Sequence, residues 1–301
     1  MTKISLIGAG SVVFARRLLQ DIVCVPELSD STVSLMDTDS ERLGLMSKFA
    51  NKLVRDTGTN INVETTTERR EALHGSDYVL TTIRVGDSYE RDIGIPLKYG
   101  VDQSVGDTIG PGGVFKALRT APVLIDICED IADVAPDANL LNYTNPMAIA
   151  CWAIAEATDV PTIGLCHSVQ HTTAELANYV GVSKERVKGW VAGINHLAWF
   201  LRFEVDGQDA YPKLIEAMQN PEIFSQDTVR FEVMKQFGYF VTESTRHMSE
   251  YTPYFRTNEQ TIEDFNLNQI RQDLKRRTVR VDDHYGQLIE DANTDRKLTA
   301  E

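Results

Sequence analysis

The sequence predicts an α/β fold in which a doubly wound parallel sheet is followed by a smaller α+β domain. Short apolar runs alternate with amphipathic helical patterns from residue 3 to residue 165, and this alternation is typical of parallel sheets with helices on both faces. A glycine turn joins the first apolar run to the first helical pattern. The alternation ends after residue 165, so we expect one domain at residues 1–165 and a second at residues 166–301.

The strands expected in the first domain are short and mostly apolar, as buried parallel strands are. We place them at residues 3–7, 32–36, 61–63, 78–83, 139–143 and 161–165. Apolar residues between these strands recur at helical spacing, as Leu43, Met46, Phe49 and Leu53 do. We expect helices at residues 40–55, 68–73, 120–134 and 147–157, and one more through Leu18, Leu19 and Ile22.

The second domain carries a different pattern. Residues 187–194 and 198–205 alternate in the manner of strands around the turn Asn195-His196. Thr172 and Glu175 have the spacing of a capping box, which predicts a helix that starts there. Residues 210–218 and 228–237 are predicted to be helical. The very polar sequence after Asn266 predicts a solvated helix pair.

The composition excludes several classes of function. The chain has 44 acidic and 30 basic residues and a formal net charge of −14, which argues against nucleic acid and anionic membranes as partners. Its four cysteines are scattered, without a CxxC pair, so we expect no disulfide framework. The N-terminus leads directly into a strand and no apolar run is long enough to cross a bilayer. We expect a cytoplasmic enzyme.

The turn after the first strand predicts a dinucleotide site. Gly8-Ala-Gly10-Ser11 lies between a strand and a helix, where backbone amides can approach a pyrophosphate at the positive end of the helix. The third glycine of the usual fingerprint is replaced by Val13. Asp37 ends the second strand, where a carboxylate contacts the adenosine ribose. Asp37 could instead start a turn and cap the next helix.

Polar residues follow three further strands at their carboxyl ends. A long polar segment at residues 84–114 contains Asp107 and follows the fourth strand. Asn142 to Asn145 follows the fifth strand, and Cys166-His167 the sixth. The carboxyl ends of parallel strands share one edge of the sheet, where ligands of such folds bind. A loop as long as residues 84–114 is usually functional or disordered.

Cys166, His167 and His196 offer soft and borderline ligands that could bind one divalent ion. The alternative is a buried free cysteine with two hydrogen-bonded histidines, because free cysteines are commonly buried. A stretch dense in titratable and hydroxyl groups, residues 238–251, lies further along the chain.

Four motifs occur together in this sequence: Gly8-Ala-Gly-Ser, Tyr143-Thr-Asn-Pro-Met, Gly164-Leu-Cys-His and Gly193-Ile-Asn-His. Their combination resembles glycoside hydrolase family 4, whose members are glycosidases that depend on NAD and a divalent metal and have a lactate/malate dehydrogenase-like fold. Residues 95–103 and 242–251 look most like the α-galactosidase branch. The resemblance covers roughly residues 3–256, and family members usually continue well past residue 301.

The resemblance also implies roles for individual residues. It implies that Cys166 and His196 bind the metal, most simply Mn²⁺, that Asn145 contacts sugar hydroxyls, and that Asp107 is the general acid. His167 would act in acid catalysis or in sugar binding, and either Glu243 or Tyr251 would be the base. The expected cofactor contacts are Gly8, Gly10, Ser11, Asp37, Arg84 and Asn142.

The reaction implied by the resemblance is hydrolysis of an α-hexoside, with an unphosphorylated α-galactoside favoured. It comprises oxidation at C3 of the sugar by NAD, removal of the C2 proton, elimination of the aglycone, addition of water and re-reduction. This route is an exception to the usual two-carboxylate mechanism of glycosidases. We expect a small-molecule glycoside as substrate and a homo-oligomeric enzyme.

Two other functions remain open on the sequence. An NAD-dependent 2-hydroxy-acid dehydrogenase of the lactate/malate type would need an Arg clamp and a His–Asp pair without a metal, yet His196 follows Asn195 and His167 follows Cys166. A non-catalytic NAD-binding protein would keep only the first domain. A metal requirement separates the first alternative from a glycosidase, and release of an aryl α-glycoside separates the second.

Overall fold

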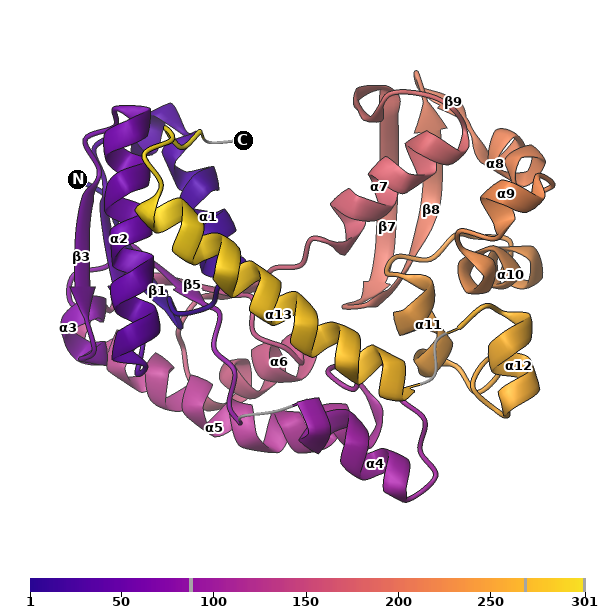
Figure 1. Cartoon of the computed structure of the whole chain (residues 1–301), viewed down its shortest axis with the longest axis horizontal. Helices are drawn as coiled ribbons and strands as arrows, with labels where there is room; N and C mark the ends of the chain where they lie inside the picture. The colour runs from indigo at the N-terminus through magenta and orange to yellow at the C-terminus, as the bar shows by residue number, and fades with distance from the viewer. Residues whose placement is uncertain (87–88, 268–269, 300–301) are drawn as a thin grey trace. The chain divides into compact units, whose positions relative to one another are not determined.

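The computed structural model of the chain describes residues 1–86, 89–267 and 270–299 (Figure 1). The chain forms two compact units. Unit 1 comprises residues 1–87, 115–165 and 275–301, and unit 2 comprises residues 88–114 and 166–274. The expected division after Leu165 coincides with one of these boundaries. We expected residues 88–114 in the first domain, but they belong to unit 2. We expected residues 275–301 in the second domain, but they belong to unit 1.

Unit 1 contains the predicted doubly wound sheet. Its six parallel strands have the order β3-β2-β1-β4-β5-β6, which is the arrangement of dinucleotide-binding sheets. The strands are β1 (Lys3–Ile7), β2 (Thr32–Met36), β3 (Asn62–Thr66), β4 (Tyr78–Thr81), β5 (Asn139–Asn142) and β6 (Thr162–Gly164). The fold class predicted from the sequence is therefore confirmed.

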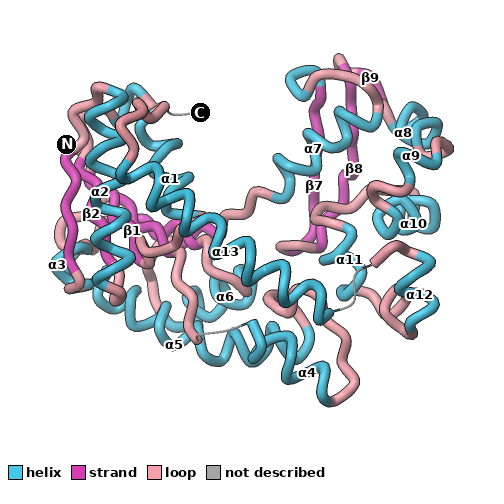
Figure 2. The backbone as a smooth tube through the Cα atoms, viewed as in Figure 1, coloured by secondary structure: helices cyan, strands magenta, loops and turns pink. Residues whose placement is uncertain are grey.

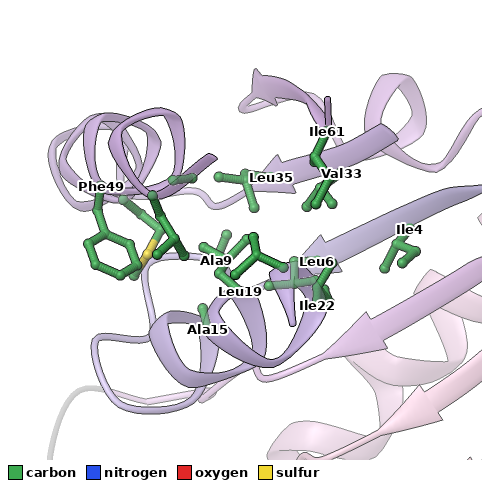
Figure 3. Close-up of a cluster of buried hydrophobic side chains, with 14 of the residues drawn as sticks. Ile4, Leu6, Ala9, Ala15, Leu19, Ile22, Val33, Leu35, Phe49 and Ile61 are labelled. Carbon is green, nitrogen blue, oxygen red and sulfur yellow. The ribbon is translucent and has the colours of Figure 1, made fainter. Parts of the chain in front are cut away.

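Alternate residues of β1 enter different cores, because successive side chains of a strand point to opposite faces. Leu6 packs with Leu35, Leu19 and Phe49 on one face (Figure 3), while Ile7 belongs to a second cluster with Val79. Full burial of each large apolar side chain contributes about 1.5–3 kcal/mol.

The helices of unit 1 are α1 (Phe14–Val23), η1 (Pro26–Leu28), α2 (Ser40–Thr57), α3 (Arg69–Leu73), α5 (Gly110–Val134), most of which lies in this unit, and α6 (Met147–Ala157).

The segment at residues 84–114 is partly helical, so the expectation of an irregular loop is wrong in part. It contains a π-helical turn, η2 (Glu90–Gly94), and α4 (Ile95–Lys98), and α5 begins at Gly110 rather than at residue 120. The run Gly110-Pro-Gly-Gly resembles a turn signal, but its glycines serve close packing. A Cβ at Gly113 would lie 2.5 Å from the carbonyl carbon of Thr108.

Unit 2 is built on an antiparallel sheet, β7 (Val187–Ile194), β8 (Leu197–Val205) and β9 (Gln208–Asp209). Helix α7 (Ser168–Tyr179) lies beside β7 (Figure 2). The main core of unit 2 contains four buried aromatic residues, Phe200, Phe203, Phe231 and Phe240. The other helical segments are η3 (Lys184–Arg186), α8 (Tyr211–Ala217), α9 (Pro221–Phe224), α10 (Thr228–Phe237), α11 (Thr245–Tyr251) and α12 (Glu259–Asp264).

Helix α7 begins four residues before the predicted capping box. Thr172 is buried inside the helix, and its hydroxyl accepts a hydrogen bond from the guanidinium of Arg230 at 3.1 Å. Glu175 forms an ion pair with the same guanidinium at 2.7 Å, and Asp227 forms another. The two residues predicted as a capping box therefore help to compensate the buried charge of Arg230, which would be costly without such partners.

The C-terminal segment forms one helix in the described residues, α13 (Ile270–Asn293), and its last part is packed rather than solvated. Leu288 and Leu298 are buried in the core that contains α1 and α2. Asp291 forms an ion pair with Arg16, and the amide of Leu298 donates to Asp56 Oδ2 at 2.9 Å. The predicted solvated helix pair is therefore wrong for this part, because polar partners elsewhere in unit 1 compensate the buried polar groups.

None of the helices in the described part of the chain combines the length and apolarity that a membrane crossing needs.

The contact between Asp56 and the C-terminal segment is sensitive to acid, because it depends on an ionised carboxylate. The hydrogen bond from Leu298 N–H, and then the bond from Lys52, lower the pKa of Asp56 from 3.8 to about 2. A carboxyl whose pKa is lower in the folded state stabilises the fold fully above its unfolded pKa and loses that effect as the pH falls through the folded pKa. We expect the NMR signal of the Leu298 amide to titrate near pH 2 and to stop titrating in Asp56→Asn. A midpoint near 4 would contradict this contact.

Candidate active site

The glycine turn after β1 is shaped by close backbone approaches. Gly8 has φ +91°, and a Cβ there would lie 2.9 Å from the carbonyl carbon of Thr82. A Cβ at Gly10 would lie 2.8 Å from Asp37 Oδ2. Both positions therefore favour glycine, because a side chain at either would clash with Thr82 or Asp37. Ser11 Oγ accepts from the amide of Phe14 at 3.3 Å, at the beginning of α1.

Asp37 organises this turn directly. Its Oδ2 accepts from the amide of Gly10 at 2.7 Å, and its Oδ1 accepts from the amide of Asp39 at 2.9 Å. Asp39, rather than Asp37, caps α2 by accepting from Glu41 and Arg42. A carboxylate can accept about four hydrogen bonds, so Asp37 keeps acceptor capacity for the hydroxyls of a ribose.

Asn142 fixes the carboxyl ends of β4 and β5. It is fully buried, and its Oδ1 accepts from Thr81 Oγ1 at 2.9 Å and from the amide of Thr144 at 3.0 Å. Its Nδ2 donates to the carbonyl oxygen of Thr144 at 3.1 Å. These bonds favour a role in shaping the strand ends over direct contact with a cofactor. Asn145 is half-buried beyond β5, and Arg84 is exposed beyond β4.

Unit 2 brings a cluster of metal-ligating side chains together from distant segments. The ligand atoms of Cys166, His196 and Glu243 all lie within 4.8 Å of one another, and so do those of Asp107, His196 and His247. Cys166 precedes α7, His196 lies between β7 and β8, Glu243 precedes α11 and Asp107 precedes α5. The structure thus places the predicted pair Cys166 and His196 side by side and adds carboxylates to it.

The contacts inside the cluster centre on Glu243. Its Oε1 lies 3.4 Å from His196 Nε2 and 3.8 Å from Cys166 Sγ. Its Oε2 lies 3.2 Å from His247 Nδ1. His196 is 6% and Glu243 11% exposed at the side chain, so these charges interact in a medium that screens them less than water does.

Protonation in the cluster is shared between Cys166 and His196. Burial alone would raise the pKa of Cys166, but hydrogen bonds with His196 and Ser168 outweigh burial and lower it. Burial would lower the pKa of His196, but Cys166, Glu243 and Asp107 outweigh burial and raise it. Both shifts move the pair toward a thiolate beside an imidazolium, and a bound cation would take the place of a proton on the imidazole nitrogen that it binds.

Thr108 determines which nitrogen of His196 faces the cluster. Its hydroxyl donates to Asp107 Oδ1 at 2.8 Å and lies 2.7 Å from His196 Nδ1. A hydroxyl has one proton, so Thr108 accepts from Nδ1–H of the ring. This network assigns the proton to Nδ1 and leaves the lone pair of neutral His196 on Nε2, beside Glu243 and Cys166.

The other two predicted catalytic residues differ in their surroundings. Tyr251 is half-buried, and its hydroxyl lies 3.3 Å from His196 Nδ1. Burial, and then the charge of Asp107, raise the pKa of Tyr251 well above its usual value. His167 is exposed at the start of α7 and packs edge-on against His171, with ring centroids 4.7 Å apart.

Sequence reasoning missed Thr108, His247 and Asn195. Among the described residues, no hydrogen-bond partner reaches the buried Oδ1 of Asn195. One signal was present in the sequence: the two-residue turn Asn195-His196 has a histidine at a position with φ +65°, where hairpin turns usually have glycine. An unfavourable residue in a tight turn indicates a chemical requirement.

Comparison with known proteins identifies relatives along nearly the whole chain. Residues 3–182 match Family 4 glycosyl hydrolase, and residues 191–299 match the Family 4 glycosyl hydrolase C-terminal domain. An α-galactosidase of Rhizobium meliloti is 42% identical over 86% of this chain and 54% of its own length. An α-galactosidase of Bacillus subtilis is 38% identical over 100% of this chain and 71% of its own length. The chain thus spans about half of the first relative and less than three quarters of the second.

Solved structures share the fold. Bacillus subtilis lplD is 27% identical with a TM-score of 0.81, over 96% of this chain and 72% of its own. A 6-phospho-α-glucosidase from gut microorganisms, solved with NAD and Mn²⁺, is 22% identical with a TM-score of 0.79, over 97% of this chain and 68% of its own. Malate dehydrogenase of Salinibacter ruber has a TM-score of 0.55 at 15% identity, over 83% of this chain and 73% of its own. With both of its parts matched in order, this chain belongs to glycosyl hydrolase family 4.

Proposed function

We propose that this chain is a glycosidase that requires NAD and a divalent metal and acts on an α-hexoside, with an α-galactoside favoured. Its membership of the family and the two α-galactosidase relatives support the reaction class. The observation that carries the proposal is the buried cluster of Cys166, His196 and Glu243 in a chain that also has a dinucleotide-type turn. A glycosidase that works with two carboxylates alone needs neither feature.

The turn in unit 1 fits NAD. Gly8 and Gly10 let the turn pack closely against Thr82 and Asp37 at the end of β1, where such folds bind a pyrophosphate, and Asp37 keeps acceptor capacity for a ribose. We assign cofactor contacts to these residues and to Ser11. Arg84 follows two positions after Thr82, which packs against Gly8, and Asn142 shapes the strand ends. NAD, when bound, supplies hydride transfer to and from the sugar.

The cluster in unit 2 fits a divalent metal. Despite burial, His196 and Ser168 lower the pKa of Cys166, in the direction of the thiolate that ligates metals. Thr108 directs His196 Nε2 into the cluster, and Asn195 Oδ1 is buried without a hydrogen-bond partner among the described residues. We propose that Cys166 and His196 hold the ion, most simply Mn²⁺. A metal at this place supplies Lewis acidity toward sugar oxygens.

The remaining residues would bind sugar and move protons. Asp107 would give a proton to the departing oxygen, and the hydroxyl of Thr108 fixes one of its carboxyl oxygens. Glu243 and Tyr251 are the candidates for removal of the C2 proton. Asn145 would bind sugar hydroxyls, and the exposed His167 would contact the substrate next to Cys166. We further propose that the enzyme is a cytoplasmic homo-oligomer.

One contact favours a second candidate, a 2-hydroxy-acid dehydrogenase. The structure gives His196 a carboxylate neighbour, Glu243, at 3.4 Å, although the residue next to it in sequence offered none. A His–carboxylate pair is what such dehydrogenases use for proton transfer. That reaction would have no use for the thiol of Cys166, which lies against the same carboxylate.

The reaction is tested with aryl α-galactosides in deuterated water, with NAD and Mn²⁺ omitted in turn. We expect cleavage only when both are present, and deuterium at C2 of the released sugar, because C2–H is removed and replaced. NMR of the product after complete turnover measures this. Cleavage with hydrogen retained at C2 would indicate a two-carboxylate hydrolase, and accumulation of NADH with a 2-hydroxy acid would indicate the dehydrogenase.

Thr108 provides a separate test of the metal site. Thr108→Val removes the acceptor for His196 Nδ1–H, and loss of such an outer contact weakens metal binding about 10- to 100-fold. Thr108→Ser keeps the hydroxyl and should bind Mn²⁺ like the wild type. Calorimetry gives both affinities, and ¹⁵N NMR of the imidazole reports the tautomer. Equal affinities and the same tautomer in Thr108→Val would show that Thr108 does not position His196.

A further inference from the structure

We propose that Glu243 is a third protein ligand of the metal rather than the base of the reaction. This inference rests on the proposed function, from which it takes an ion held by Cys166 and His196. On the sequence, either Glu243 or Tyr251 could be the base. This inference assigns Glu243 to the metal and leaves Tyr251 as the candidate base.

The spacing of the three donor atoms is that of ligands around one ion. Glu243 Oε1 lies 3.4 Å from His196 Nε2 and 3.8 Å from Cys166 Sγ, and all three donor atoms lie within 4.8 Å of one another. Ligands bonded to an ion at about 2.0–2.3 Å are separated from each other by roughly 3.0–3.7 Å, depending on the coordination geometry. The separation of Oε1 from His196 Nε2 falls within this range, and its separation from Cys166 Sγ is about 0.1 Å above it.

The backbone holds Glu243 in place from both sides. Before it, Val241 forms a bridge with Trp199, and the amide of Thr242 donates to the carbonyl oxygen of Ala198 at 2.8 Å. After it, Ser244 caps α11. Between these anchors Glu243 has φ +74°, in the left-handed region that costs a residue with a side chain about 1–3 kcal/mol. Such a conformation persists where the position of the side chain matters.

His196 has the same unfavourable conformation, with φ +65°. These are two of the four non-glycine residues with positive φ in the described part of the chain, and they face each other at 3.4 Å. Two strained residues whose donor atoms converge indicate a site that is formed before its ion binds.

The second carboxylate oxygen has an orienting partner. Oε2 lies 3.2 Å from His247 Nδ1, one turn along the chain on α11, and the same nitrogen lies 3.0 Å from Ser244 Oγ. Partners of this kind orient metal-binding carboxylates. A base that removes a proton from carbon needs an oxygen free to reach the substrate, whereas Oε1 of Glu243 lies against His196 and Cys166 and Oε2 lies against His247.

The experiment uses the full chain and Co²⁺ as a spectroscopic probe, with calorimetry of Mn²⁺ alongside. Glu243→Ala removes the ligand, and Glu243→Gln keeps the side-chain shape while removing its charge. Glu232→Gln, a carboxylate on α10 in the same unit that bonds to Gln236, is the matched control for loss of one negative charge. Circular dichroism confirms that each variant is folded.

We expect both Glu243 variants to bind Mn²⁺ at least about tenfold more weakly than the wild type, because a direct ligand is lost. The thiolate-to-cobalt absorption should persist, since Cys166 remains, while the ligand-field bands shift. Glu232→Gln should match the wild type in both measurements. If Glu243 is instead the base, its variants keep metal affinity and cobalt spectrum and lose only exchange at C2 of the sugar.

Unchanged spectra and affinities in Glu243→Ala and Glu243→Gln would overturn this inference and leave the proposed function standing. An equal loss of affinity in Glu232→Gln would also overturn it, because the effect would then be one of net charge. A wild-type chain that binds neither ion would overturn the metal site of the proposed function and this inference together.

Discussion

The carboxylate of Glu250 joins two parts of unit 2 that lie 145 residues apart in the sequence, and the candidate site depends on this connection. It accepts from the amide of Val105 at 2.7 Å and from the amide of Gly106 at 3.1 Å. Hydrogen bonds to a charged acceptor contribute about 1.5–3 kcal/mol each. Asp107 and Thr108 follow directly along the chain, so these bonds between α11 and the segment before α5 bring both residues to His196.

Close packing within residues 92–113 holds the segment before α5 in its shape. Gly106 has φ +57°, and a Cβ there would lie 3.0 Å from Ile93 Cγ1. The side chain of Gln103 donates to the carbonyl oxygen of Ile109 at 2.9 Å and accepts from the amide of Gly112 at 3.1 Å. The segment thereby folds against the beginning of α5. A helix that starts with three glycines is intrinsically unfavourable, and these tertiary contacts compensate for that cost.

Local patterns were sufficient to predict most of the sheet, because most of its strands are short and mainly apolar runs; β3, Asn62–Thr66, is polar and was expected at residues 61–63. The sequence also singled out Gly10 and Asp37, which form a hydrogen bond, and it suggested the proximity of Cys166 to His196. Local patterns failed where contacts between residues far apart in the sequence determine the structure. The start of α5 depends on residues 92–108, and the burial of Thr172 depends on Arg230. Glu243 could not be matched with His196, because 47 positions of sequence separate them.

The charges of the cluster explain how it remains assembled both without and with a cation. Burial would lower the pKa of His196, but Cys166, Glu243 and Asp107 outweigh burial and raise it, so a proton on the ring is stabilised by these acidic neighbours. A divalent ion bound at Nε2 must displace that proton, and it then provides the positive charge at the same place. The surrounding negative groups would then face a positive charge in both cases, of one unit from the ring proton and of two from the ion. The strained backbone of His196 and Glu243 places their side-chain atoms 3.4 Å apart, so the fold itself already positions the groups that the proposed ion would meet.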